Sequence, residues 1–137
     1  MLIVKFINNT RLSQLMDQLE ELESTFLEEY SSAMLLEKGA KYKSATILLS
    51  KAVFALVDYI LFRKYKVLPK NHVERFRILE RREPDLYSLL DALWNDYTDT
   101  YHKPAAEESI ILMKETIEKI SQNESTSPKI KESVRKA

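Results

Sequence analysis

The stretch KYKSATILLSKAVFALVDYILFRK, residues 41–64, decides the fold of this chain. Its apolar residues recur at helical spacing on two neighbouring stripes, so the segment is apolar almost all round. We expect one helix from about Ala40 to Lys66. Such a helix lies at the centre of a domain or at an interface between subunits, because it needs other apolar surfaces on several sides.

One narrow polar line interrupts this apolar helix. Ser44, Lys51 and Asp58 recur along it every seven residues. A charged side chain on a buried helix is costly unless an opposite charge or hydrogen bonds compensate it. Lys51 and Asp58 are therefore candidate site residues, which either contact a ligand or find a charged partner within the protein.

The flanking sequence supplies the helices that would cover this core. An amphipathic helix starts near Asn9–Thr10 and ends at Gly39, a short helix is capped by Asn71, and further helices begin at Pro84 and Pro104. One glycine and four prolines are too few for many short strands joined by hairpins. We predict an all-α, up-and-down bundle of about five helices, a four-helix core plus a short third helix, with no sheet.

The length of 137 residues indicates one domain. We assign residues 1–121 to a single helical domain and residues 122–137, which are polar and contain Pro128, to a flexible C-terminal tail. The chain contains no cysteine, which excludes disulfides, thiolate nucleophiles and cysteine-based zinc sites.

The apolar segments are poor candidates for targeting or membrane insertion. The sequence MLIVKFI, residues 1–7, is a poor signal peptide because it includes Lys5 and has no cleavage site of small residues. The run from Ala52 to Phe62 contains Asp58 and is too short to cross a bilayer. We therefore expect a cytoplasmic protein that does not bind a membrane.

Charge is balanced over the whole chain but not along it. Residues 1–37 carry two basic and seven acidic side chains (−5), residues 38–82 twelve and three (+9), and residues 83–137 seven and eleven (−4). A basic centre between acidic ends is typical of a nucleic-acid-binding surface, with Arg75 and Arg77 as candidate RNA contacts. The same charge pattern also occurs where helices pack against one another with opposite charges at their edges.

The stretch NDYTDTYHKP, residues 95–104, contains one of the two histidines, His102. The helix dipole favours the charged form of a histidine at a helix C-terminus, and Tyr97, Tyr101 and Lys103 nearby are candidate ligand contacts. The same residues also fit a capping histidine whose neighbours pack in the core. The other histidine, His72, fits a local capping or packing role.

Signatures of common enzymes are absent from the sequence. It has no glycine-rich phosphate loop, no nucleophile elbow and no two-histidine zinc pattern. We therefore expect no metal and no cofactor.

The order of these features resembles the HEPN domains (higher eukaryotes and prokaryotes nucleotide-binding). The matching parts are the central helix quoted above, the junction from Pro69 to His72 that leads into a short helix, and a fourth helix that runs into the polar stretch with His102. A fifth helix then closes the bundle. The resemblance covers Lys38–Ile120.

The resemblance implies a helical bundle that forms a homodimer, often through the helices that carry the polar motif. Many HEPN proteins are metal-independent ribonucleases that act on RNA, often as toxins paired with a nucleotidyltransferase partner protein. Their motif is an arginine, often followed by a polar residue, then four to six residues and a histidine. His102 matches this histidine, and the resemblance makes it a candidate catalytic residue, together with Asn95 and Asp96 at the positions of the arginine.

The chain departs from the motif where the arginine belongs, because these positions hold Asn95, Asp96 and Tyr97. An arginine there would stabilise the charge of the transition state, as donors do in oxyanion sites. Asn95 has no charge, and Asp96 would repel the phosphate. Catalysis by His102 as an acid or base would therefore need another cation, such as Lys51 or Lys103.

Three functions fit these residues. We favour a HEPN-like module that is non-catalytic or weakly active and binds a nucleotide, RNA or a partner protein, as in toxin–antitoxin pairs. The second is an interaction or scaffold protein that acts by homodimerisation, because the central helix and residues 1–7 offer more apolar surface than a small bundle covers. The third is a metal-independent ribonuclease that uses His102.

Overall fold

The computed structural model describes the backbone of residues 2–99 and 107–137, and the side chains of residues 10–94, 98 and 107–137. Within these residues the chain forms six α-helices and no strand, which confirms the predicted all-α helical bundle. The helices are α1 (Leu2–Lys38), α2 (Tyr42–Tyr65), α3 (His72–Arg82), α4 (Pro84–Asp99), α5 (Glu107–Ser121) and α6 (Pro128–Lys136).

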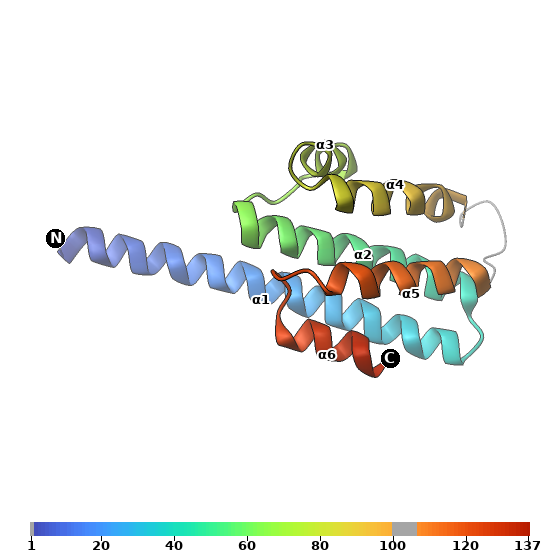
Figure 1. Cartoon of the computed structure of the whole chain (residues 1–137). Coiled ribbons are helices and arrows are strands. Elements are labelled where there is room, and N and C mark those ends of the chain that lie inside the picture. The colour runs from blue at the N-terminus through green and yellow to red at the C-terminus, as the bar shows by residue number, and fades with distance from the viewer. Residues whose placement is uncertain (1, 100–106) are drawn as a thin grey trace.

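Helix α2 lies at the centre of the bundle (Figure 1). Helix α1 runs antiparallel to it and forms the largest helix–helix contact, and α5 forms the next largest. Helices α3 and α4 cover α2 on the opposite side from α1, and α6 packs against α1 and α5. Helix α3 is seen nearly along its axis in Figure 1, so it crosses the direction that the other helices share.

Helix α2 is buried along most of its length, as its apolar residues on several sides predicted. Leu49, Leu56, Ile60 and Leu61 are fully buried and pack with side chains from α1, α4 and α5. By length and composition alone α2 is also able to span a membrane, and 72% of its most apolar window is buried inside the bundle.

The connection between α1 and α2 begins at Gly39, where the sequence predicted the end of the first helix, since α1 ends at Lys38. The left-handed conformation in this connection is that of Ala40, with φ of 57°. The backbone N–H groups of Ala40 and Lys41 donate to the carbonyls of Glu37 and Leu36, at 3.0 and 2.9 Å. This paired arrangement satisfies the last carbonyls of α1.

Helix α1 begins earlier than predicted. The sequence favoured Asn9–Thr10 as the start, yet the helix runs from Leu2, so both residues lie inside it. The N-terminal part of α1 extends beyond the end of the bundle in Figure 1.

Residues 122–137 also differ from the sequence prediction, which made them a flexible tail. They contain α6, whose Ile130 and Val134 are buried against the bundle. Ser127 caps this helix by accepting a hydrogen bond from the backbone N–H of Ile130 at 3.2 Å, and Pro128 occupies the first turn. The side chain of Ser127 also hydrogen-bonds to Glu23 on α1. The folded unit therefore continues past residue 121.

Candidate functional site

Helix α3 begins where the sequence predicted. Pro69 follows the end of α2, and the side chain of Asn71 accepts a hydrogen bond from the backbone N–H of Glu74 at 2.9 Å. His72 is therefore the first residue of the helix. Arg75, about one helical turn after the cap, faces α2. Arg77, two residues later, faces away from α2 and lines a groove.

Arg75 joins α3 to the central helix. Its guanidinium donates from Nε to Asp58 Oδ1 at 2.7 Å and from Nη2 to Asp58 Oδ2 at 2.8 Å. Both residues are buried, so this is a two-pronged ion pair with little access to water. Burial raises the pKa of the Asp58 carboxyl, while the hydrogen bonds and charge of Arg75 act in the opposite direction. The pair accounts for the acidic charge on the polar line of α2.

His72 belongs to the same cluster. The third nitrogen of the Arg75 guanidinium, Nη1, lies 2.6 Å from His72 Nδ1. A guanidinium only donates, so Nδ1 accepts and the imidazole carries its proton on Nε2. Burial lowers the pKa of His72, and the positive charge of Arg75 lowers it further. His72 is therefore held in its neutral form.

Aromatic side chains surround this polar cluster. The His72 ring lies 4.6 Å from the Phe54 ring and 5.1 Å from the Trp94 ring, measured between centroids. Phe76 on α3 contacts Trp94 and Tyr87 on α4 in edge-to-face geometry, at 5.4 and 6.2 Å. Such contacts between rings stabilise the junction of α2, α3 and α4 beyond the area that they bury.

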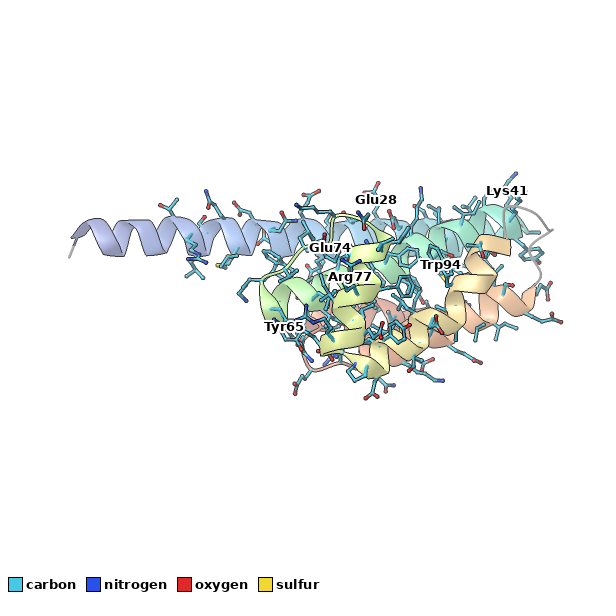
Figure 2. All side chains as sticks on the ribbon, turned by 90° about the horizontal axis from the view of Figure 1, so that it is seen from above. Glu28, Lys41, Tyr65, Glu74, Arg77 and Trp94 are labelled. Atoms are coloured by element: carbon cyan, nitrogen blue, oxygen red, sulfur yellow. The ribbon has the colours of Figure 1, made fainter. Side chains whose placement is uncertain are left out.

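An open groove of about 420 Å³ lies between α3 and α4, above this aromatic cluster. It is lined by His72, Val73, Phe76, Arg77, Glu80, Tyr87, Asp91 and Trp94. Figure 2 shows Arg77 on α3 and Trp94 on α4, the two helices that border the groove. Its volume is in the range of small-ligand sites.

The groove combines three kinds of chemical group. Its rings offer π surfaces for stacking on a planar base. Glu80 and Asp91 accept hydrogen bonds, and Arg77 donates them. Rings can stack on a planar base, carboxylates can accept hydrogen bonds from amino groups, and a cation can bind a phosphate.

The outer side of α3 and the loop before it are basic. Residues 63–82 carry eight basic and two acidic side chains. Two of the basic residues, Lys64 and Arg75, are in ion pairs with Glu83 and Asp58. The exposed cations are Arg63, Lys66, Lys70, Arg77, Arg81 and Arg82. A polyanion thus meets concentrated positive charge beside the groove.

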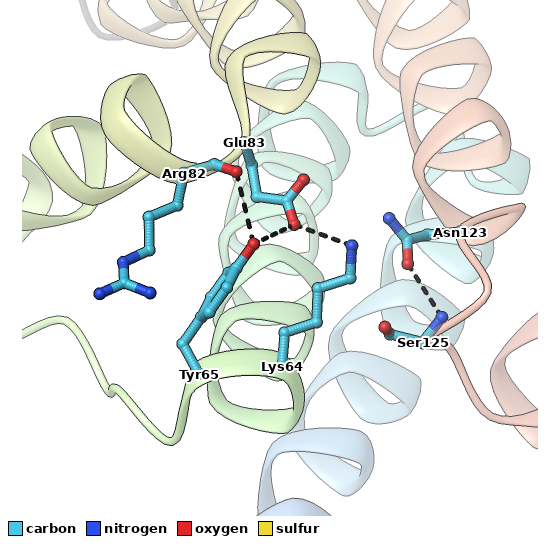
Figure 3. Close-up of polar contacts among 6 residues, drawn as sticks. All are labelled: Lys64, Tyr65, Arg82, Glu83, Asn123 and Ser125. Atoms are coloured by element: carbon cyan, nitrogen blue, oxygen red, sulfur yellow. Dashed lines mark hydrogen bonds and ion pairs between the residues drawn. The ribbon is translucent and has the colours of Figure 1, made fainter.

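Glu83 fixes the junction between α3 and α4. Its carboxylate accepts hydrogen bonds from Lys64 Nζ at 2.8 Å and from the Tyr65 hydroxyl at 2.9 Å (Figure 3). The guanidinium of Arg82 lies over the Tyr65 ring, 4.8 Å from its centroid. These contacts attach the α3–α4 junction to the C-terminal end of α2, so both walls of the groove are held by the core helix.

The predicted ligand-binding residues on α2 and α3 have different surroundings. Asp58 and Arg75 are occupied with each other, whereas Arg77 is exposed on the groove. Lys51 is exposed on α2 and lowers the pKa of Glu29 on α1, although burial has the larger and opposite effect on that carboxyl. Of these residues, Arg77 is the one in a position to contact a ligand in the groove.

The predicted motif around the second histidine lies outside the described residues. His102, Tyr101 and Lys103 are in the segment 100–106, for which no structure is described. Asn95, Asp96 and Tyr97 belong to α4, but their side chains are outside the described set. Within the residues described, no three His, Cys, Asp or Glu side chains gather closely enough to hold a metal ion.

The groove itself was missed by sequence reasoning, which did not single out Phe76 or Trp94 as site residues. A signal was present, because His72, Phe76 and Glu80 follow one another at intervals of four residues along one face of α3. The facing residues of α4 are not evident without knowing how the two helices pack.

Comparison of the chain with protein-family models, with curated proteins and with solved structures finds no match.

Proposed function

We propose that this chain is a HEPN-like helical module that binds RNA or a nucleotide on the face formed by α3 and α4, without cleaving it. The observation that carries the proposal is the aromatic groove between these helices with exposed arginines beside it. Proteins that bind single-stranded nucleic acid combine base stacking on aromatic rings with a basic surface that follows the backbone.

Each part of this face has a role in the proposal. A base enters the groove against Phe76 and Trp94, and its amino groups donate to Asp91 or Glu80. Phosphates lie along α3 beside Arg77 and neighbouring cations. The buried pair of Asp58 and Arg75 positions α3 and has no contact with the ligand.

Binding without cleavage is supported by the residues of the HEPN-type motif. The arginine that would stabilise a phosphorane is missing, because the three positions where it could stand hold Asn95, Asp96 and Tyr97. Incubation of RNA with the protein and with a His102→Ala variant tests this part. We expect intact RNA from both proteins, and RNA cleavage that His102→Ala abolishes would show a ribonuclease instead.

Fluorescence anisotropy of a labelled single-stranded RNA tests the binding proposal. We expect binding at 50 mM salt that weakens steeply as salt rises, because each phosphate contact displaces counterions. Changing Arg77, Arg81 and Arg82 to Gln should lower the affinity by about tenfold or more and flatten the salt dependence.

The matched control removes the same charge from the other side of the molecule. Lys129, Lys131 and Arg135 are exposed on α6, which lies on the opposite side of the bundle from α3 (Figure 1). Their change to Gln should leave the affinity within about twofold, since only screened long-range charge is lost. Equal losses from both triple variants, or no binding at low salt, would contradict the proposal.

A further inference from the structure

The two helices of the central hairpin have unequal lengths. Helix α1 has 37 residues and α2 has 24. At a rise of 1.5 Å per residue, α1 is about 55 Å long and α2 about 36 Å. About 20 Å of α1 therefore extends past the end of its partner, and Figure 1 shows this N-terminal part extending beyond the other helices. We call residues 2–16 the overhang.

The apolar stripe of α1 continues onto the overhang. Within the bundle, Leu19 and Leu22 pack against the core. At the next positions of the same stripe, Leu12 and Met16 are 56% and 53% exposed. A stripe that is covered along the bundle and uncovered just beyond it indicates that another surface covers the overhang.

An unsupported helix of this length is marginal in water. Isolated helices shorter than about 12 to 15 residues gain too little from their backbone hydrogen bonds to offset nucleation. The overhang contains Asn8, Asn9 and Thr10, which have low helix propensity. Packing against a second surface would stabilise it.

The charges of α1 identify what that surface is. Residues 1–16 contain two basic and no acidic side chains, and residues 17–29 contain six acidic and no basic side chains. Two copies of α1 placed antiparallel bring the basic overhang of each toward the acidic part of the other. Two parallel copies would bring like charges level with each other, which is unfavourable.

We propose that the overhang is a self-association surface, on which two copies of this chain pair antiparallel through Leu12 and Met16. The pairing has twofold symmetry, so one patch serves both subunits. It is independent of RNA binding, because α3 and α4 are on the far side of α2 from α1 (Figure 1).

Sedimentation velocity at 10 to 200 µM protein tests the self-association. We expect a dimer that dissociates on dilution for the natural chain and a monomer for the double variant Leu12→Glu with Met16→Glu. A thermal midpoint equal to that of the natural chain, with both measured at a concentration where the natural chain is monomeric, shows that the variant is folded, as expected for side chains that do not pack in the core.

Leu35→Glu is the matched control. Leu35 is also an α1 leucine and is 70% exposed, but it lies near the other end of the helix. This variant should remain dimeric. A natural chain that is monomeric at 200 µM, or an overhang variant as dimeric as Leu35→Glu, would overturn the proposal.

The orientation has its own test, because the chain has no cysteine of its own. A single Ser24→Cys substitution, at an exposed position of α1, accepts a spin label. In the antiparallel pair, residues 24 of the two copies are about 30 Å or more apart along the axis. A dimer with labels about 10 Å apart is parallel and would contradict the proposed arrangement.

Discussion

Two arginines on one helix show how differently the two faces of α3 are used. Arg75 faces α2, is buried and forms a two-pronged ion pair with Asp58. Arg77, two residues later, is exposed and lines the groove between α3 and α4. The inner face holds the helix in place and the outer face is available to a ligand. The residue type alone does not separate these roles, whereas the packing does.

The largest effect on stability is expected at the inner face of α3, where Arg75 contacts α2. Asp58→Ala leaves the guanidinium of Arg75 buried without its partner, which should lower the free energy of unfolding by about 3 to 5 kcal/mol. Asp91→Ala on the exposed rim of the groove should change it by less than about 0.5 kcal/mol. Urea unfolding followed by circular dichroism measures both, and similar losses from the two variants would remove the distinction.

Two apolar residues of α3 should show the same contrast between a buried and an exposed side chain, with a smaller loss of stability. Leu79 is fully buried and Val73 is 67% exposed. Leu79→Ala removes core contacts and leaves a cavity, at a cost of about 2 to 5 kcal/mol. Val73→Ala should cost less than about 0.5 kcal/mol. If Val73→Ala destabilised the protein as much as Leu79→Ala, the groove would be closed rather than open.

The smallest effect on stability is a dependence on pH. Burial and Arg75 lower the pKa of His72 below 6.5, so the unfolded chain takes up this proton at a higher pH than the folded protein. Stability should therefore fall as the pH decreases from about 6.5 toward the lowered pKa, by at most about 1.4 kcal/mol per unit of pKa difference. Above pH 7 both states are neutral at this residue, and no loss occurs.

His72→Gln isolates this contribution, because it removes the imidazole and leaves the carboxylates. Burial raises the pKa values of Asp58 and Glu29, which favours the folded state on acidification and so opposes the effect of His72. The difference in unfolding free energy between the natural chain and the variant should change with pH between 7 and 5. A constant difference would mean that His72 is not held neutral by its surroundings.

The sequence predicted the core well, because burial follows from periodicity. The segment from Ala40 to Lys66 is apolar on most faces, and α2 is the central buried helix. The need of Asp58 for a partner also followed from its place on that helix. The identity of the partner did not, since Arg75 reaches Asp58 only because α3 turns back across α2 after Pro69.

Two boundaries were mispredicted for physical reasons that are visible in hindsight. Helix α6 was hidden by its polar composition, although Ser127 and Pro128 form a helix start and Ile130 and Val134 are spaced to share one face. The start of α1 was placed at Asn9–Thr10 because these residues are good caps, which is a weak local preference. Neither error affects the helices that form the groove.

The central claim is that RNA binds at the groove of α3 and α4, and the fluorescence of Trp94 tests it most directly. Trp94 is the single tryptophan of the chain and lines the groove, so its emission responds to a change in its surroundings there. Titration with single-stranded RNA at 50 mM salt should quench Trp94 in a saturable way. The quenching should weaken with salt and be reduced when Arg77, Arg81 and Arg82 are changed to Gln. RNA binding that leaves Trp94 emission unchanged, or no binding at low salt, would contradict the claim.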